Sequence, residues 1–298
     1  MKILIVGASG LVGSSLMREA QKCGHDVVGT QRSQTLPGLQ TLDLSDRAAG
    51  ANLLAQHQPA AVICCAAFPW ADGCERDPDR AFRENRDQPT DLARASHSLG
   101  ASFVYFSSSY VFDGVHGPYA EEDQTNPISV YGQSKLQGET AVLEATQGTA
   151  IIARTMGVYG EETLRKNFVY QVIDTLSAGR RMKVPDDQFG NATHSADLAL
   201  MTLALLDKSA SGIWNTAGPE PDLNRKDFAL RIAKEYALDT SLFDFVPTPK
   251  LNQPALRPTH GGLRIDKVVA AVAFVPVMRI GMLKGASCME QSHTAQLR

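Results

Sequence analysis

The chain has 298 residues, of which 43% are hydrophobic and 20% are charged, and its formal net charge is −3. This composition is typical of a globular protein, and it excludes a disordered chain or a strongly basic nucleic-acid-binding surface. No apolar run approaches the roughly 18 residues that cross a bilayer, so we expect a cytoplasmic protein with no membrane partner. The five cysteines form no C-x-x-C pair and the seven histidines no zinc motif, so no metal site is expected.

The first element is a β-branched run over residues 2–6, which predicts a buried strand. A glycine-rich turn with the sequence G-A-S-G-L-V-G follows at residues 7–13, and residues 14–22 have helical spacing. Glycines in such a turn allow the backbone to approach a pyrophosphate, and the helix N-terminus offers unpaired N–H groups to it. Strand, turn and helix together predict a dinucleotide-binding site.

Further strands are predicted at residues 25–29, 39–42, 60–65, 102–107 and 150–154, with helices at 47–57, within 82–99 and after Tyr131. This alternation predicts an α/β fold, a Rossmann-type doubly wound parallel sheet. We expect a cofactor domain over residues 1–160, with segments returning near 190–215. A smaller, interleaved C-terminal α/β substrate lobe is expected over 161–285, including a helix at 225–236, and a tail over 286–298.

The end of the second strand discriminates between the two nicotinamide cofactors. An acid at this position hydrogen-bonds the adenosine ribose, whereas an arginine accommodates a 2′-phosphate. The chain has Arg32 and Ser33 here and no acid, which favours NADP(H) over NAD(H). Asp43, after the third strand, could contact the adenine amine or cap the following helix.

Tyr131 and Lys135 are four residues apart on a predicted helix and therefore share one face. A neighbouring ammonium group favours the phenolate, so we expect Lys135 to lower the pKa of Tyr131 towards neutrality. A tyrosine tuned in this way is a candidate proton donor.

These motifs together resemble the extended short-chain dehydrogenase/reductase family. The stretches at residues 106–114 and 117–127 resemble the same family. The stretch at residues 186–193 and the Arg257-Pro258 pair are similar to its dTDP-4-dehydrorhamnose reductase subgroup. The resemblance covers roughly residues 1–270. It implies NADPH-dependent reduction of a keto group on a nucleotide-linked deoxysugar, with a small-molecule substrate and no nucleic acid, and it allows a homodimer.

The resemblance also implies roles for individual residues. Tyr131 would protonate the carbonyl oxygen, Lys135 would hold the nicotinamide ribose, and Ser108 would orient the carbonyl. The implied cofactor-binding residues are Gly7, Ser9, Gly10, Leu11, Val12, Gly13, Arg32, Ser33, Asp43, Leu44, Cys65, Ala66, Ala67, Asn85, Tyr131, Lys135 and Met156. The implied substrate-binding residues are Phe68, Trp70, Ser109, Tyr110, Asn167, Gln188 and Arg257.

Three features depart from the subgroup pattern. Ser109 replaces a usual aspartate, which weakens the substrate assignment, and Cys64 replaces a common asparagine. The third is the presence of Trp70 and Cys74 in the loop after the fourth strand, where the family often sets substrate specificity. Three alternatives therefore stay open. One is a sugar-nucleotide epimerase or dehydratase, although Ser109-Tyr110 lacks the acid pair of dehydratases. The second is a non-catalytic NADP-binding subunit similar to the methionine adenosyltransferase beta subunit. The third is a reductase of a non-nucleotide carbonyl.

Overall fold

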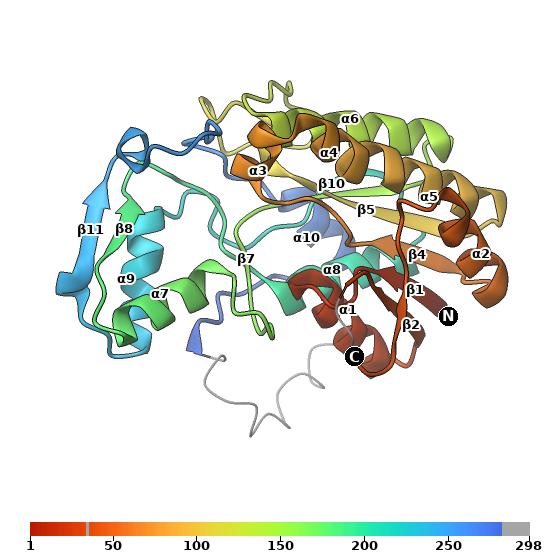
Figure 1. Ribbon diagram of the computed structural model, residues 1–298, viewed down its shortest axis with the longest axis horizontal. Helices are drawn as coiled ribbons and strands as arrows, with labels where there is room; N and C mark the ends of the chain where they lie inside the picture. Colours follow the sequence, from red (N-terminus) through yellow and green to blue (C-terminus); the bar gives the residue numbers. More distant parts are fainter. Residues whose placement is uncertain (34–35, 282–298) are drawn as a thin grey trace.

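A computed structural model describes residues 1–33 and 36–281, and Figure 1 shows a central sheet with helices on both faces and a smaller group of elements at one end. The tail expected over 286–298 lies outside the described residues. The sheet has seven strands in the order β10-β6-β5-β4-β1-β2-β3, and all neighbouring strands are parallel. The strands are β1 (Lys2–Val6), β2 (Asp26–Gln31), β3 (Leu39–Thr41), β4 (Ala61–Cys64), β5 (Ser102–Ser108), β6 (Ile151–Thr155) and β10 (Gly212–Asn215).

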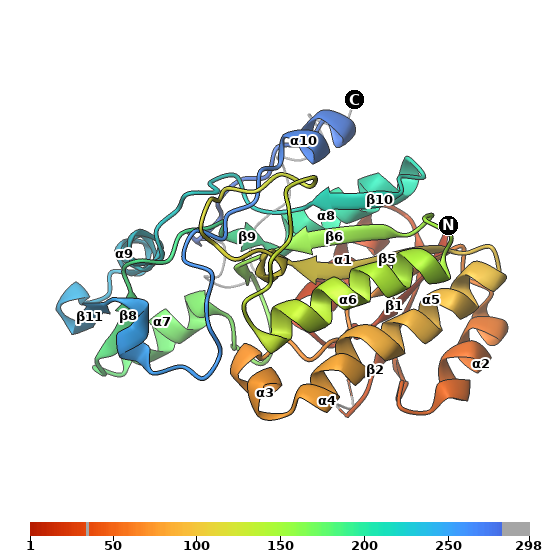
Figure 2. The same ribbon diagram turned by 90° about the horizontal axis from the view of Figure 1, so that it is seen from above.

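The helices divide between the two faces of this sheet (Figure 2). One face carries α1 (Leu11–Lys22), α8 (Ser195–Asp207) and α10 (Asp266–Val272), and the other carries α2 (Arg47–His57), α5 (Gln88–Ser98) and α6 (Val130–Ala145). Each face has its own buried apolar cluster. The predicted Rossmann-type doubly wound sheet is therefore confirmed.

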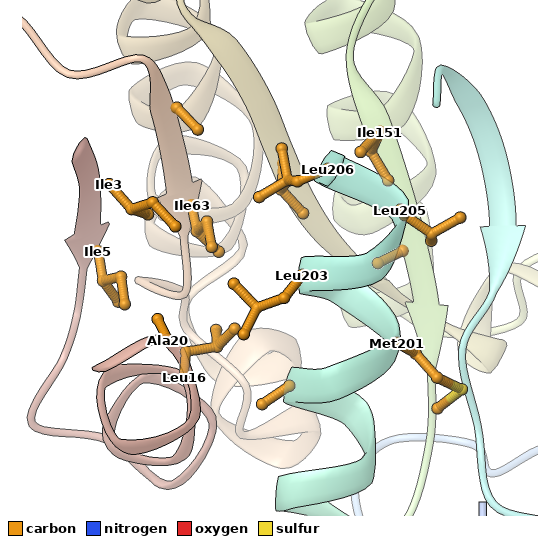
Figure 3. Packing of buried hydrophobic residues seen from close by; sticks show 14 of the residues in the cluster. Ile3, Ile5, Leu16, Ala20, Ile63, Ile151, Met201, Leu203, Leu205 and Leu206 are labelled. Carbon is orange, nitrogen blue, oxygen red and sulfur yellow. The ribbon is translucent and has the colours of Figure 1, made fainter. Parts of the chain in front are cut away.

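Helix α8 is apolar on nearly all sides because it is covered by the sheet and by α1. Leu203, Leu205 and Leu206 of α8 pack beside Ile63 and Ile151 of the strands, as Figure 3 shows. A helix that is hydrophobic all round is typically enclosed by other elements. At the α1 contact, the Ser15 hydroxyl donates to Ser195 Oγ at 2.7 Å.

The long helix predicted within 82–99 contains an irregular turn that the sequence analysis did not foresee. It begins earlier, as α4 (Pro78–Phe82), continues as a π-helical turn (Arg83–Asp87) and ends as α5. Pro89 has no N–H to donate to the carbonyl of Asn85. That carbonyl instead accepts a hydrogen bond from the Tyr105 hydroxyl at 2.6 Å, so β5 anchors the irregular turn.

The smaller lobe is built from α7 (Phe168–Ser177), β8 (Met182–Pro185), α9 (Arg225–Glu235) and β11 (Phe243–Val246). It has a separate buried cluster, in which Val172 of α7 packs with Phe228 of α9. A short parallel pair joins β7 (Val158–Tyr159), which precedes α7, to β9 (Thr193–His194), which follows β8. Strand β10 was not predicted, because it has four residues and only Ile213 and Trp214 are large and apolar. Short helices are α3 (Ala71–Arg76) and three 3₁₀ turns, Ser109–Val111, Thr240–Leu242 and Thr248–Leu251.

Candidate active site

The glycine-rich turn between β1 and α1 has the geometry that a pyrophosphate requires. Gly7 has a φ of +85°, and a Cβ on Gly13 would lie 2.3 Å from the Gly7 carbonyl oxygen. A Cβ on Gly10 would meet no atom closer than 3.5 Å. The N-terminus of α1 has no side-chain cap and no acidic residue in its first turn. The turn therefore leaves backbone N–H groups and a favourable dipole available to an anion.

The loop after β4 lies directly against this turn. A Cβ on Gly7 would approach the backbone nitrogen of Ala66 to 2.9 Å, and the Cys65 N–H donates to the Val6 carbonyl at 2.8 Å. The structure thus brings together Gly7, Cys65 and Ala66, which the sequence analysis grouped in one site. Cys64 is buried one residue earlier, and burial raises its pKa to about 11.

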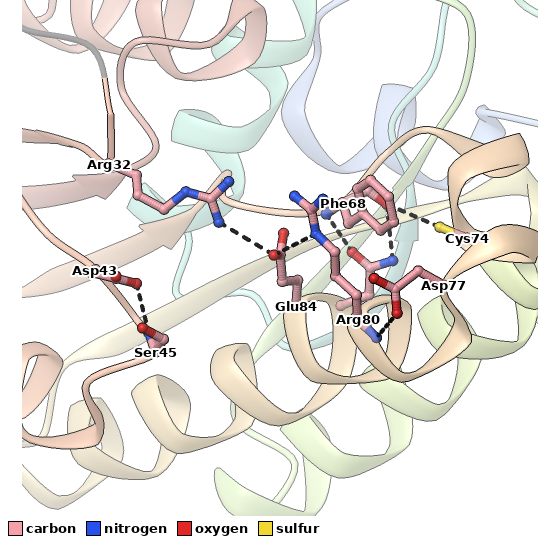
Figure 4. Close-up of polar contacts among 9 residues, drawn as sticks. Arg32, Asp43, Ser45, Phe68, Cys74, Asp77, Arg80 and Glu84 are labelled. Carbon is pink, nitrogen blue, oxygen red and sulfur yellow. Dashed lines mark hydrogen bonds and ion pairs between the residues drawn. The ribbon is translucent and has the colours of Figure 1, made fainter.

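Arg32, at the end of β2, faces an acid that the sequence analysis did not consider. Its guanidinium is 3.3 Å from the Glu84 carboxylate, which also pairs with Arg80 at 2.8 Å (Figure 4). The Arg32 side chain is 54% exposed, whereas that of Glu84 is 11% exposed. Ser33 is exposed beside it. A 2′-phosphate at this position would have to compete with Glu84 for the Arg32 guanidinium.

Asp43 is held in a turn at the start of α2. Its Oδ1 accepts a hydrogen bond from the Ser45 N–H at 2.9 Å, and this bond lowers the pKa of the Asp43 carboxyl. Asp46, not Asp43, caps α2 by accepting from the Ala48 N–H. Leu44, which directly follows Asp43 in the sequence, is half-buried.

Tyr131 and Ser108 meet at the carboxyl edge of the sheet. Ser108 is the last residue of β5, and Tyr131 is the second residue of α6, which begins at the Ser129 cap. The Ser108 hydroxyl lies close enough to the Tyr131 phenol to act on its pKa. The Ser108 Oγ also accepts from the Tyr110 N–H at 3.3 Å, so the backbone of the following turn orients the serine.

The expected pKa effect of Lys135 on Tyr131 is wrong in this structure. Burial raises the pKa of Tyr131, and the neighbouring Ser108 hydroxyl opposes the rise. Lys135 is buried, its Nζ lies 4.1 Å from the centre of the Tyr105 ring, and burial lowers its own pKa to about 8. The i, i+4 spacing places both side chains on one face, but desolvation outweighs the neighbouring charge.

Asn85, predicted in the cofactor site, is fully buried behind it. Its amide oxygen accepts from the Phe68 N–H at 2.8 Å. Its amide nitrogen donates to the Phe68 carbonyl at 3.1 Å and to Ser134 Oγ at 3.0 Å. The side chain therefore ties the loop after β4 to α6, which carries Tyr131 and Lys135.

Tyr110 and Arg257 form the wall next to the candidate catalytic group. The Tyr110 ring packs edge-on against the Tyr131 ring, with centroids 5.4 Å apart. Arg257 lies close enough to the Tyr110 phenol to act on its pKa, and it pairs with Asp72 at 2.9 Å. Asp72 also accepts from the Ala255 N–H at 3.1 Å. This contact joins α3, in the sheet half of the molecule, to the segment after β11.

Two predicted substrate residues lie at the start of the loop that leads to α3. The Phe68 ring is buried under the Arg80 guanidinium, 4.1 Å from the ring centre. Trp70 is 54% exposed and carries Arg76 over its ring. The pair thus differs: Phe68 is part of the packed interior, and Trp70 is open to solvent.

Three other predicted substrate residues have distinct surroundings. Ser109 is 1% exposed, and its hydroxyl has no hydrogen-bond partner among the described residues. Asn167 occupies the N-cap position of α7 without a side-chain capping bond, and its amide nitrogen donates to the Gly160 carbonyl at 2.9 Å. The Gln188 amide donates to the Thr248 hydroxyl at 3.0 Å.

Met156 and Ala67 complete the predicted set. The Met156 sulfur, after β6, accepts from the Asn191 N–H at 3.3 Å. Ala67 is half-buried between Ala66 and Phe68.

The sequence analysis missed Thr155, which lies opposite Ser108 in the β5–β6 register and has a buried hydroxyl without a partner in the described part of the chain. The register of adjacent parallel strands is the signal that could have found it.

Over residues 1–33 and 36–281, no three His, Cys, Asp or Glu side chains are grouped so that they could hold a metal ion. In the same residues, no helix is both long and apolar enough to span a membrane.

Comparisons with known proteins identify the family of this chain. The sequence matches the family described as the RmlD substrate binding domain over residues 1–279. It is 34% identical over 275 residues to a probable low-salt glycan biosynthesis reductase of Haloferax volcanii, covering 90% of this chain and 91% of the relative. It is 36% identical over 268 residues to a dTDP-4-dehydrorhamnose reductase of Mycobacterium tuberculosis, covering 88% and 84%. Methionine adenosyltransferase 2 subunit beta of Bos taurus is 34% identical over 247 residues, covering 80% and 73%.

Solved structures give the same result. A dTDP-4-dehydrorhamnose reductase of Clostridium acetobutylicum superposes with a TM-score of 0.85 at 30% identity, covering 95% of this chain and 97% of that one. The Bacillus anthracis dTDP-4-dehydrorhamnose reductase in complex with NADP also has a TM-score of 0.85, at 26% identity and with coverage of 94% and 96%. This chain belongs to the RmlD substrate binding domain family, within the extended short-chain dehydrogenases/reductases, which are NAD(P)-dependent oxidoreductases.

Proposed function

We propose that this protein uses NADPH to reduce a keto group on a nucleotide-linked deoxysugar, as a dTDP-4-dehydrorhamnose reductase does. The observation that carries the proposal is the contact between Ser108 and Tyr131, at the same sheet edge as the glycine turn at residues 7–13. Open α/β sheets bind ligands at the carboxyl ends of their strands. A proton donor and a dinucleotide turn at one edge are the two groups that carbonyl reduction requires.

In this proposal Tyr131 donates its phenolic proton to the carbonyl oxygen of the substrate. Burial raises its pKa, so the phenol keeps its proton at neutral pH and is ready to act in the direction of reduction. Ser108 hydrogen-bonds the same oxygen and orients the carbonyl. The bound nicotinamide would supply the hydride.

The Lys135 ammonium group would bind the hydroxyls of the nicotinamide ribose. Its Nζ lies over the Tyr105 ring, so its role in this proposal is positional and electrostatic. A cation at this place also stabilises negative charge that develops on the substrate oxygen. Asn85 would position the loop after β4 rather than contact the cofactor, since both ends of its amide are used within the protein.

The adenosine end of the cofactor would lie between the turn, Arg32 with Ser33, and Asp43 with Leu44. The backbone at 65–67 and Met156 would line the path towards the nicotinamide. The group fits the residues present, because Gly10 leaves open space above the uncapped N-terminus of α1. The Arg32 guanidinium would release the Glu84 carboxylate and bind the 2′-phosphate in its place.

We expect Arg32→Asp to raise the Kd for NADPH by about a hundredfold and to change the Kd for NADH by less than about threefold. The variant replaces the Arg32 cation by a second carboxylate beside Glu84. A phosphate dianion would then face two carboxylates and no arginine at this position. Fluorescence titration with each cofactor measures both constants. Arg94→Asp, at an exposed arginine of α5 that pairs with Asp91, is the matched control. Equal losses for the two cofactors would refute the phosphate assignment.

The substrate would lie between the sheet edge and the smaller lobe, near Phe68, Trp70, Ser109, Tyr110, Asn167, Gln188 and Arg257. The partition into a cofactor domain over 1–160 and a substrate lobe over 161–285 belongs to this proposal. So do a cytoplasmic location, a homodimeric state and the absence of a nucleic-acid partner.

A second candidate function is a non-catalytic regulatory subunit. The 34% identity to methionine adenosyltransferase 2 subunit beta is close to the identity to the reductases, so sequence similarity alone favours neither. Fold does not imply function, and an intact site can be retained for cofactor binding alone.

The test is NADPH oxidation, followed at 340 nm, by the pure protein with a panel of dTDP-4-keto-6-deoxy sugars and with NADH in parallel. We expect turnover on at least one sugar, faster with NADPH. Tight NADPH binding without turnover on any sugar would contradict the reductase proposal and favour the regulatory subunit.

A further inference from the structure

Arg225 occupies a position that helix stability disfavours. It is the first residue of α9, followed by Lys226, and Asn224 caps the helix by accepting from the Lys226 N–H at 2.8 Å. The N-terminal turn of a helix carries partial positive charge, so acidic residues stabilise it and cations destabilise it. Two consecutive cations here indicate a requirement other than the stability of α9.

Among the described residues, the Arg225 guanidinium has no acidic partner. Its central carbon lies 3.6 Å from the centre of the Phe168 ring, and no residue in the described part of the chain forms a hydrogen bond or ion pair with it. Burial lowers the pKa of Arg225 to about 10. Arg257, in contrast, is already paired with Asp72. Arg225 is half-buried, and a partly desolvated cation without a counter-ion is costly unless a ligand supplies the negative charge.

Arg225 also lies among the predicted substrate residues. The backbone N–H of Arg225 donates to the backbone carbonyl of Gln188 at 2.8 Å. Phe168, which the guanidinium covers, directly follows Asn167, whose Oδ1 is buried and has no partner among the residues described. The Tyr110 phenol is close enough to act on the charge of Arg225, and the Tyr110 ring contacts the Tyr131 ring. Arg225 is thereby connected to the candidate catalytic tyrosine through one aromatic side chain.

We propose that Arg225 binds the diphosphate of the nucleotide sugar, and that Arg257 instead holds Tyr110 and Asp72 in place. This inference rests on the proposed function and names the residue that recognises the anionic part of its substrate. A guanidinium stacked on an aromatic ring lies in a plane parallel to that ring. Its N–H groups point outward in this plane, where they can bind two phosphate oxygens at once. The Phe168 ring fixes that plane before the ligand arrives, so little side-chain entropy is lost on binding.

The experiment measures dTDP binding by isothermal titration calorimetry, with the full chain saturated with NADP⁺. We expect Arg225→Gln to raise the Kd for dTDP by about 10- to 100-fold, the range for losing charge-assisted hydrogen bonds. Arg225→Lys keeps the charge but cannot make bidentate hydrogen bonds to a phosphate. Its Kd for dTDP should therefore lie between those of Arg225→Gln and the unaltered protein. Lys226→Gln removes the neighbouring cation, whose Nζ lies over Phe245, and is the matched control with an expected change below about twofold.

Two further readouts separate binding from folding and from the proposed function. NADPH affinity should be the same in Arg225→Gln and in the unaltered protein, which shows that the variant is folded. The affinity for thymidine, which has no phosphate, should be the same in both. If the unaltered protein binds dTDP and Arg225→Gln binds it equally well, the inference about Arg225 is wrong while the proposed function stands. If the unaltered protein binds no dTDP, both are wrong.

Discussion

Tyr131→Phe should lower kcat by about 10²- to 10⁴-fold while the Kd for NADPH stays within about twofold of the unaltered value, because only the proton donor is removed. The ring stays in place against Tyr110, and the lost hydroxyl contacts Ser108. No other described phenol has this contact: the Tyr110 phenol interacts with Arg257 and that of Tyr105 donates to Asn85. Steady-state NADPH oxidation and a cofactor titration together measure the effect.

The matched control for this loss is Tyr236→Phe. It deletes the same atom from a tyrosine of the smaller lobe, whose hydroxyl donates to the Ile280 carbonyl at 2.9 Å. Its kcat should stay near that of the unaltered protein. If Tyr131→Phe reduces the sugar at the normal rate, the carbonyl oxygen takes its proton from another group, and the role proposed for Tyr131 is wrong.

The parts of the site that lie in contiguous sequence could be predicted. The glycine spacing at residues 7–13 determines the local backbone, since Gly13 must approach the Gly7 carbonyl for α1 to follow β1. Likewise, the spacing of Tyr131 and Lys135 determines their common face on α6. The alternation of strands and helices predicted the doubly wound sheet, because right-handed crossovers leave few other arrangements.

Burial could not be predicted from spacing, and it decides the electrostatics. The sequence analysis expected Lys135 to lower the pKa of Tyr131, whereas desolvation raises the pKa of Tyr131 and lowers that of Lys135. The same difficulty applies to Asn85. Its side chain is directed inward by a π-helical turn, and that turn depends on Pro89 and on Tyr105 from a strand about twenty residues away.

The residues that were missed take their meaning from contacts between distant segments. Glu84 matters because it lies beside Arg32, 52 residues earlier in the chain. Arg225 matters because its helix begins beside Gln188 and Phe168, and neither segment has a pattern that points to the other. In the linear sequence Arg225 is indistinguishable from a surface arginine at the start of an amphipathic helix.

A second large effect is expected at the ion pair that supports the catalytic strand. Arg154 of β6 makes two bonds to Glu139 of α6, at 2.9 and 2.8 Å, and both side chains are 3% exposed. The Ser107 hydroxyl, next to Ser108, donates to the same carboxylate. A third Arg154 nitrogen donates to the Glu121 carbonyl at 3.1 Å. The pair thus joins β5, β6 and α6 beneath Ser108 and Tyr131.

Arg154→Met should lower the free energy of unfolding by about 3–5 kcal/mol, because it removes the cation that pairs directly with the buried Glu139 carboxylate. Urea denaturation measures the loss. The double variant Arg154→Met/Glu139→Leu removes both charges and should recover most of the stability, since a buried ion pair and apolar residues of similar volume are often close in energy. Arg94→Met, at the exposed pair with Asp91, should cost less than about 1 kcal/mol. A loss for Arg154→Met no larger than for Arg94→Met would mean that water reaches Glu139, and that this pair does not hold Ser108 in place.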